Sequence, residues 1–133
     1  MKRLRFSLLP GFYAVSRLAS HDAVPAWADG GGAPGFSSVS RSPAELSIVC
    51  PEDRVPAGVK SERAWRCLEV EGPFDFGEVG VVASFAASLA AEGIGIFVVS
   101  TFDTDYLFVK SESLERTVLA LSRDGHTVIL KDG

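Results

Sequence analysis

Two aspartates, Asp103 and Asp105, follow the apolar run Ile94–Thr101 directly. A D-x-D pair after a strand is the pattern of phosphatases that form an aspartyl phosphate. The next residues here are Tyr106-Leu107, not the small or β-branched residue that such a loop needs. Two carboxylates without a third ligand do not make a magnesium site either. We therefore expect Asp103 to be a turn residue and Asp105 to begin a strand.

The remaining residues with reactive side chains do not form a catalytic pattern. His21 falls in a predicted loop and His126 in a turn after Gly125, so we expect both to be solvated. The glycine-rich stretch 30–35 is not followed by Lys-Ser or Lys-Thr, and it indicates a linker, not a phosphate loop. The sequence thus predicts no catalytic residue, no metal ligand and no cofactor.

Binding chemistry is carried by Gly80 and Asp105. We expect Gly80 in the first turn of a helix over Phe76–Glu92, where unpaired amides attract a carboxylate and a glycine lets a ligand approach. Close packing of this helix on a sheet explains the glycine equally well. Asp105, at the same end of the predicted sheet, can pair with an ammonium group. Together the two residues predict a site for a zwitterion.

The composition is that of a small globular protein. The chain has 133 residues, of which 47% are hydrophobic and 23% charged, and its formal net charge is −4. This length corresponds to one domain or two very small ones. The charge argues against nucleic acid as a partner, and no uncharged run approaches the roughly 18 residues that span a membrane. We interpret the N-terminus as a strand and a turn, not a signal peptide, and expect a cytoplasmic protein with two buried thiols, Cys50 and Cys67.

Hydrophobic periodicity predicts an α+β fold. Alternating residues predict strands over 3–8 and 63–71, and the run Ile94–Thr101 predicts a central strand. In the helix Phe76–Glu92, one apolar stripe contains Val81 or Val82, Phe85 and Leu89. Further strands are predicted over 13–18, 36–41, 45–50, 105–110 and 127–130, and a second helix between Ser111 and Gly125. From Arg63 onward the order is βαββαβ, which is the ferredoxin-like pattern.

An internal repeat extends this pattern to the first half of the chain. Residues 39–49 match residues 99–109 at a constant offset of 60, and both stretches indicate the same hairpin. We therefore predict two tandem units, a degenerate one over 1–60 and a complete one over 61–133. In the degenerate unit the helices are expected to have shrunk to short turns near Pro25–Ala28 and Pro56–Val59.

Residues 80–109 resemble the ACT domain, in the subgroup of bacterial tandem ACT proteins and cytosolic arginine sensors. The stretches that carry the resemblance are Gly80–Ala83, Leu89–Ile96 and above all Ser100–Val109, with weaker matches at 45–50 and 65–73. The resemblance implies a small-molecule-binding regulatory module without catalysis. Its typical ligand is an amino acid, bound where two ACT units meet.

The resemblance also assigns residues to this site. It implies that Gly80 lies beside the ligand, that Thr101 and Phe102 supply backbone contacts, and that Asp105 is the acidic anchor. Ile94, Gly95 and Ile96 match a segment that faces the ligand from the neighbouring unit. Gly95 stands where the sensors have a polar or bulkier residue. Four units in the sensors against two here imply a homodimer; the alternative is a structural or partner-binding module without a ligand.

Overall fold

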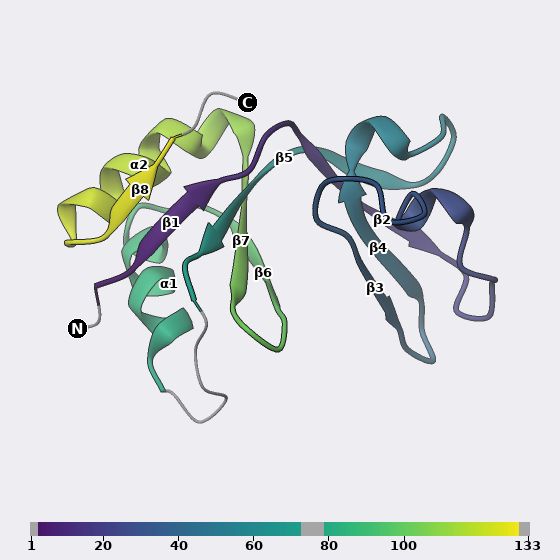
Figure 1. Cartoon of the computed structure of the whole chain (residues 1–133), viewed down its shortest axis with the longest axis horizontal. Helices are drawn as coiled ribbons and strands as arrows, with labels where there is room; N and C mark the ends of the chain where they lie inside the picture. Colours follow the sequence, from purple (N-terminus) through teal and green to yellow (C-terminus); the bar gives the residue numbers. More distant parts are fainter. Residues whose placement is uncertain (1–2, 73–78, 131–133) are drawn as a thin grey trace. The chain divides into compact units, whose positions relative to one another are not determined.

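The chain divides into two compact units. The computed structural model describes residues 3–72 and 79–130. Unit 1 comprises residues 1–10 and 66–133, and unit 2 comprises residues 11–65. Unit 2 is therefore inserted into the chain of unit 1, and the N-terminal residues fold with the C-terminal half of the chain (Figure 1). The two predicted repeats stay a prediction about the sequence, because the compact units have other limits.

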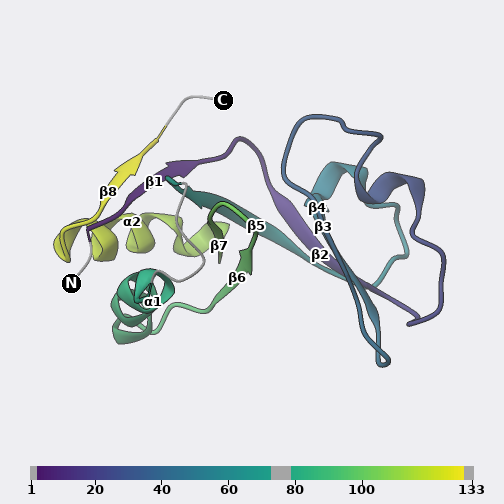
Figure 2. The same ribbon diagram turned by 60° about the horizontal axis from the view of Figure 1, so that its bottom comes forward.

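Unit 1 has the predicted ferredoxin-like order of elements. After β1 (Arg5–Leu8) it continues with the end of β5 (Ser61–Val70). The elements that follow are α1 (Val81–Ala91), β6 (Ile96–Ser100), β7 (Asp105–Lys110), α2 (Leu114–Arg123) and β8 (Thr127–Ile129). Both helices lie on the same side of the sheet (Figure 2). The α+β fold of the βαββαβ type is thus confirmed.

One core joins the helices of unit 1 to its sheet. The apolar stripe of α1 contains Val81, Phe85 and Leu89, and it packs with Leu121 of α2 against the sheet. Val82, the alternative member of the predicted stripe, is exposed. The strands contribute alternate residues to this core, as expected of a sheet covered on one face: Phe6, Leu68, Val70, Leu107 and Val109.

The N-terminal strand β1 lies between two strands of the βαββαβ unit. It pairs antiparallel with β5, where Phe6 is opposite Val70, and parallel with β8, where Phe6 is opposite Val128. The sheet order in unit 1 is therefore β8-β1-β5-β7-β6. Residues 1–10 complete the sheet of unit 1, since without them β5 and β8 have no common neighbour.

Unit 2 is a small sheet with only short helical turns. It contains β2 (Tyr13–Leu18), β3 (Ser38–Arg41), β4 (Leu46–Pro51) and the first half of β5, in the order β3-β4-β2-β5. Its described residues form single 3-10 turns at Ala26–Ala28 and Glu52–Arg54. The first turn agrees with the prediction near Pro25–Ala28, whereas the second precedes the predicted position.

Each unit contains a hairpin of the same design, and the offset between the two hairpins differs from the predicted one. In the β3–β4 hairpin Arg41 is opposite Leu46, and in the β6–β7 hairpin Ser100 is opposite Asp105. Both spacings are 59 residues, and the 3-10 turn Glu52–Arg54 corresponds to Ser111–Ser113 at the same offset. The offset of 60 is wrong by one residue. Such a shift would place every matched side chain on the opposite face of its strand.

The first helix begins later than predicted. Gly80 has φ 85° and precedes α1, so it is the residue before the helix and not part of its first turn. The left-handed backbone at Gly80 cannot continue into a helix, and this explains why α1 begins at Val81. The predicted residues 76–78 lie outside the described part of the chain.

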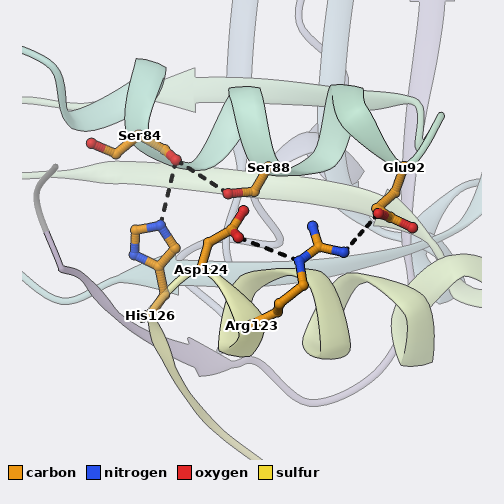
Figure 3. Close-up of polar contacts among 6 residues, drawn as sticks. All are labelled: Ser84, Ser88, Glu92, Arg123, Asp124 and His126. Carbon is orange, nitrogen blue, oxygen red and sulfur yellow. Dashed lines mark hydrogen bonds and ion pairs between the residues drawn. The ribbon is translucent and has the colours of Figure 1, made fainter.

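His126 is buried, contrary to the prediction. Its ring is only 4% exposed, and Nδ1 accepts a hydrogen bond from the Leu4 amide at 3.1 Å. An Nδ1 that accepts leaves the proton on Nε2, which lies 3.4 Å from the Ser84 carbonyl oxygen of α1 (Figure 3). The ring also meets Phe6 edge-on. His126 therefore connects β1, α1 and the segment before β8.

Neither cysteine forms a disulfide. Cys50 and Cys67 are free and buried, as predicted, and burial raises the pKa of both thiols. Thiols held protonated in this way are poor nucleophiles. Among the described residues, no helix has both the length and the apolar character needed to cross a membrane.

Candidate functional site

The N-terminus of α1 offers backbone amides to a ligand. The helix has 11 residues, and no side chain among the described residues caps its start. The Gly80 carbonyl accepts from the Ser84 amide at 3.0 Å and from the Ser84 hydroxyl at 2.5 Å. The amides of the first turn have no partner within a helix, and together with the helix dipole they attract an anion. A Cβ built on Gly80 would meet nothing within 4 Å, so the backbone is open there.

The β6–β7 turn brings together three further residues of the predicted ligand site, Thr101, Phe102 and Asp105. Thr101 and Phe102 lie in the turn, and Phe102 is 76% exposed. Asp105 begins β7, is half-buried, and accepts a hydrogen bond from the Ser100 hydroxyl. This bond holds one carboxylate oxygen and leaves the other free to accept an ammonium proton.

The α1 start and the β6–β7 turn occupy the same end of unit 1, where β5 ends (Figure 1). Two contacts attach the β6–β7 turn to the end of β5. The Thr104 hydroxyl donates to the Val70 carbonyl at 2.5 Å, and a Cβ on Gly72 would come within 3.0 Å of the Asp103 carbonyl oxygen. The turn is thus attached to the last residues of β5, from which the chain continues toward Gly80.

The predicted segment Ile94–Ile96 lies at the opposite end of these elements. Ile94 is buried and its amide donates to the Leu89 carbonyl just beyond α1, and Ile96 begins β6. An 11-residue helix is about 16 Å long, so the segment is separated from Gly80 by the length of α1. Unit 1 of one chain therefore presents two groups of predicted residues at its two ends.

The stretch of sequence that contains Asp103 and Asp105 is acidic. Residues 67–109 contain no Lys, Arg or His, but they contain seven acidic residues: Glu69, Glu71, Asp75, Glu78, Glu92, Asp103 and Asp105. Glu71 pairs with Arg5, and Glu92 pairs with Arg123. Neither aspartate of the turn has an ion pair within the described residues. The site favours a positively charged group beside Asp105 and leaves a ligand carboxylate to the amides of α1.

The described residues contain no group of three side chains able to hold a metal ion. Asp103 is exposed in the turn, and its carbonyl, not its carboxylate, makes the contact with Gly72. Two carboxylates that leave the same turn from different positions do not form a metal centre on their own.

Sequence reasoning passed over Thr104 and Gly72. Thr104 stands between the two aspartates, and Gly72 directly follows the predicted strand over 63–71. A threonine in a turn gives no sign of burial, because turn threonines are usually solvated. The contact between Gly72 and Thr104 reveals the role of both residues, and this contact exists only in the folded chain.

The fold and this site define a ferredoxin-like regulatory class, and family comparison gives the same result. Residues 60–123 match the family model of the ACT domain, and residues 11–58 match a model described as an N-terminal domain. Residues 60–123 therefore belong to the ACT domain family.

Three relatives illustrate the range of this likeness. The crystal structure of protein Atu0741 from Agrobacterium tumefaciens has a TM-score of 0.93 and 44% identity, over 100% of this chain and 97% of that one. The cytosolic arginine sensor for mTORC1 subunit 1 of Mus musculus is 31% identical over 90 residues, which are 67% of this chain and 27% of the sensor. The chain thus spans about a quarter of that relative. The ligand-free regulatory subunit of aspartate kinase from Thermus thermophilus, with TM-score 0.61 and 11% identity over 90% of this chain and 96% of that one, shares the fold.

Proposed function

We propose that the protein is a regulatory module that binds a free amino acid at the end of unit 1 where α1 begins. The observation that supports this most directly is the uncapped start of α1 at the same end as the half-buried carboxylate of Asp105. The amides of α1 would bind the ligand carboxylate, and Asp105 would bind its ammonium group. Thr101 and Phe102, in the β6–β7 turn, would supply backbone contacts to the ligand.

The two aspartates of the β6–β7 hairpin favour an amino acid that carries a net positive charge. Asp103 and Asp105 would attract a second positive group on the ligand, while Arg5, at the same end of the sheet, is paired with Glu71. The named ligand of the mouse relative, arginine, has this charge. The same relative is named as cytosolic, and we propose the cytoplasm as the compartment of this protein too.

A homodimer would reconcile the two groups of predicted residues. Within unit 1, Ile94–Ile96 lie about one helix length from Gly80 and cannot reach the same small ligand. If they face a ligand, they face one that is bound by a second copy of the chain. Strand β6 pairs only with β7 within the described residues, so its free edge is available for such an association.

Regulation would follow from differential affinity. A ligand shifts a dimer or a partner contact only as far as it prefers one of the two states. A ligand site at the β6–β7 turn would lie next to the free edge of β6, so the ligand and the second copy would act on the same hairpin.

An amino-acid screen with matched variants tests the site. A ligand at 100 times its Kd adds about 2.7 kcal/mol of stability, which thermal-shift measurements detect. We expect a positively charged amino acid to raise the Tm, and Asp105→Asn to abolish the increase. Asp103→Asn removes the same charge from an exposed position two residues away and should keep most of it. Equal ligand responses of the two variants would remove Asp105 from the site.

One observation favours the alternative of a partner-binding module without a ligand. Val79 is 83% exposed and Phe102 is 76% exposed, near the start of α1 and in the β6–β7 turn. Apolar side chains left in water at one end of a domain are typical of a protein contact. If no amino acid raises the Tm, this alternative is the better one.

A further inference from the structure

The β6–β7 turn contains one buried side chain, Thr104. Thr101, Phe102 and Asp103 are exposed, whereas Thr104 is only 8% exposed. Its hydroxyl donates to the Val70 carbonyl at 2.5 Å. The bond therefore connects the turn with a strand that lies 34 residues away in the sequence.

The turn does not need Thr104 for its own conformation. In unit 2 the corresponding turn of β3–β4 has Glu45 at this position, and it closes in the same way. The Ser42 amide donates to the Glu45 carbonyl at 2.9 Å there, and the Thr101 amide donates to the Thr104 carbonyl at 2.8 Å here. The Ser42 and Thr101 hydroxyls also make equivalent bonds within their turns. The β3–β4 turn is bonded to its neighbouring strand through the Ala44 carbonyl, which accepts from Arg17 of β2 at 3.2 Å, whereas in the β6–β7 turn the side chain of Thr104 makes this bond.

Gly72 contacts the same turn from the side of β5. A Cβ at this position would lie 3.0 Å from the Asp103 carbonyl oxygen and 3.1 Å from Thr104 Cβ. The two backbones are therefore in direct contact, and Thr104 holds them at this distance. The contact therefore joins the β6–β7 turn to the end of β5.

We propose that Thr104 is a positioning residue of the ligand site. Its hydroxyl fastens the β6–β7 turn to the end of β5, and so sets Thr101, Phe102 and Asp105 relative to the sheet against which α1 packs. Thr104 needs no contact with the ligand. This inference rests on the proposed function, because it assigns Thr104 a role in that same site.

The experiment compares two buried threonines of unit 1. Thr104→Val removes the hydroxyl and keeps the shape, and Thr104→Ser keeps the hydroxyl. Thr117→Val is the matched control, because the Thr117 hydroxyl also donates to a carbonyl, that of Ser113 at 2.8 Å, but within α2. Titration calorimetry uses the amino acid that stabilises the wild type in the screen. We expect Thr104→Val to raise its Kd about tenfold, and Thr104→Ser and Thr117→Val to stay within about threefold of the wild type.

Unchanged affinity in Thr104→Val would overturn the inference, as would an equal loss in Thr117→Val, since the effect would then follow stability alone. Hydrogen exchange of the segment 100–106 separates this result from a failure of the proposed function. If the wild type binds no amino acid, the ligand site fails. Faster exchange of this segment in Thr104→Val, but not in Thr117→Val, still supports the fastening of the turn, and equal exchange rejects it.

Discussion

Individual residues of unit 1 are fixed by few but buried polar bonds. His126 accepts from the Leu4 amide and lies against the Ser84 carbonyl, and the two bonded segments are 122 and 42 residues away in the sequence. A buried donor that loses its partner costs about 1–3 kcal/mol, which is more than the net gain from an average hydrogen bond. Single side chains at such positions therefore decide how firmly β1 is attached.

We predict that His126→Ala lowers the free energy of unfolding by about 3 kcal/mol. The change leaves the Leu4 amide without its acceptor and opens a cavity beside Phe6. Urea denaturation measures the loss. His21→Ala, at an exposed position, is the control and should change stability by less than about 0.5 kcal/mol. Similar stabilities of the two variants would show that the Leu4 contact contributes little.

Asp124 makes the stability of the helix pair depend on pH. The Ser88 hydroxyl and then the Arg123 guanidinium hold the pKa of Asp124 below its usual value of 3.8. Figure 3 shows Arg123 between Asp124 and Glu92, with Nε 3.3 Å from the Asp124 carboxylate. A carboxyl group with a lowered pKa binds its proton less readily in the folded protein. Its contribution is therefore present near neutral pH and is lost as the pH falls through the lowered pKa.

We predict that the stability difference between the wild type and Asp124→Asn is constant near neutral pH and disappears below about pH 4. Protonation removes from the wild type the charge that the variant already lacks. Urea midpoints measured between about pH 7 and pH 2 follow this difference. A difference that persists at the acidic end would assign the effect of the variant to packing instead of charge.

At the scale of elements, the contact between β5 and the β6–β7 turn depends on the absence of a side chain at Gly72. Its backbone has an ordinary φ, so only space limits the position. Gly95 has neither a close neighbour nor a positive φ, and it serves as the matched control.

We predict that Gly72→Ala destabilises the protein by about 1–3 kcal/mol, because its Cβ would displace the backbone of Asp103. Gly95→Ala should leave stability within about 0.5 kcal/mol of the wild type. Differential scanning calorimetry compares the two. If Gly72→Ala unfolds at the wild-type temperature, the turn yields easily and the contact with β5 is loose.

At the scale of the whole molecule, the arrangement of the chain repeats one hairpin and omits two helices. The β3–β4 hairpin of unit 2 repeats β6–β7 at the 59-residue spacing. The stretch of unit 2 that corresponds to α1 contains only the 3-10 turn Ala26–Ala28, and the stretch that corresponds to α2 contains no helix. Only unit 1 therefore combines a helix N-terminus with the hairpin turn. The proposed ligand site belongs to unit 1 for this reason.

The proposed homodimer is tested by sedimentation velocity. We expect a sedimentation coefficient above that of a 14.1 kDa monomer at micromolar concentration, shifted further by the amino acid that raises the Tm. Val99→Lys adds charge to β6 at a position that does not belong to the core of unit 1, and it should favour the monomer, since charged side chains oppose pairing at a sheet edge. Lys110→Glu changes a charge at the far end of β7 as the control. A wild type that stays monomeric with and without amino acids would exclude the dimer.

The sequence by itself determined the elements of this protein and their order. Alternation in β1 and β5, the apolar stripe of α1 and the turn residues around Asp103 are local properties, because periodicity and turn chemistry depend on neighbours in the sequence. Several stretches together, above all Ser100–Val109, also indicated the ACT domain, which the family model confirms over residues 60–123.

Only the tertiary structure decided where β1 lies, why Gly72 is glycine and which side chains near the site are buried. The insertion of β1 between β5 and β8 joins residues from both ends of the chain, and no local pattern encodes that pairing. Threonine and histidine in turns are usually solvated. Thr104 and His126 are buried, because segments distant in the sequence supply their hydrogen-bond partners. Burial of a polar group is a property of the packed chain, and the sequence records it only through partners that folding brings together.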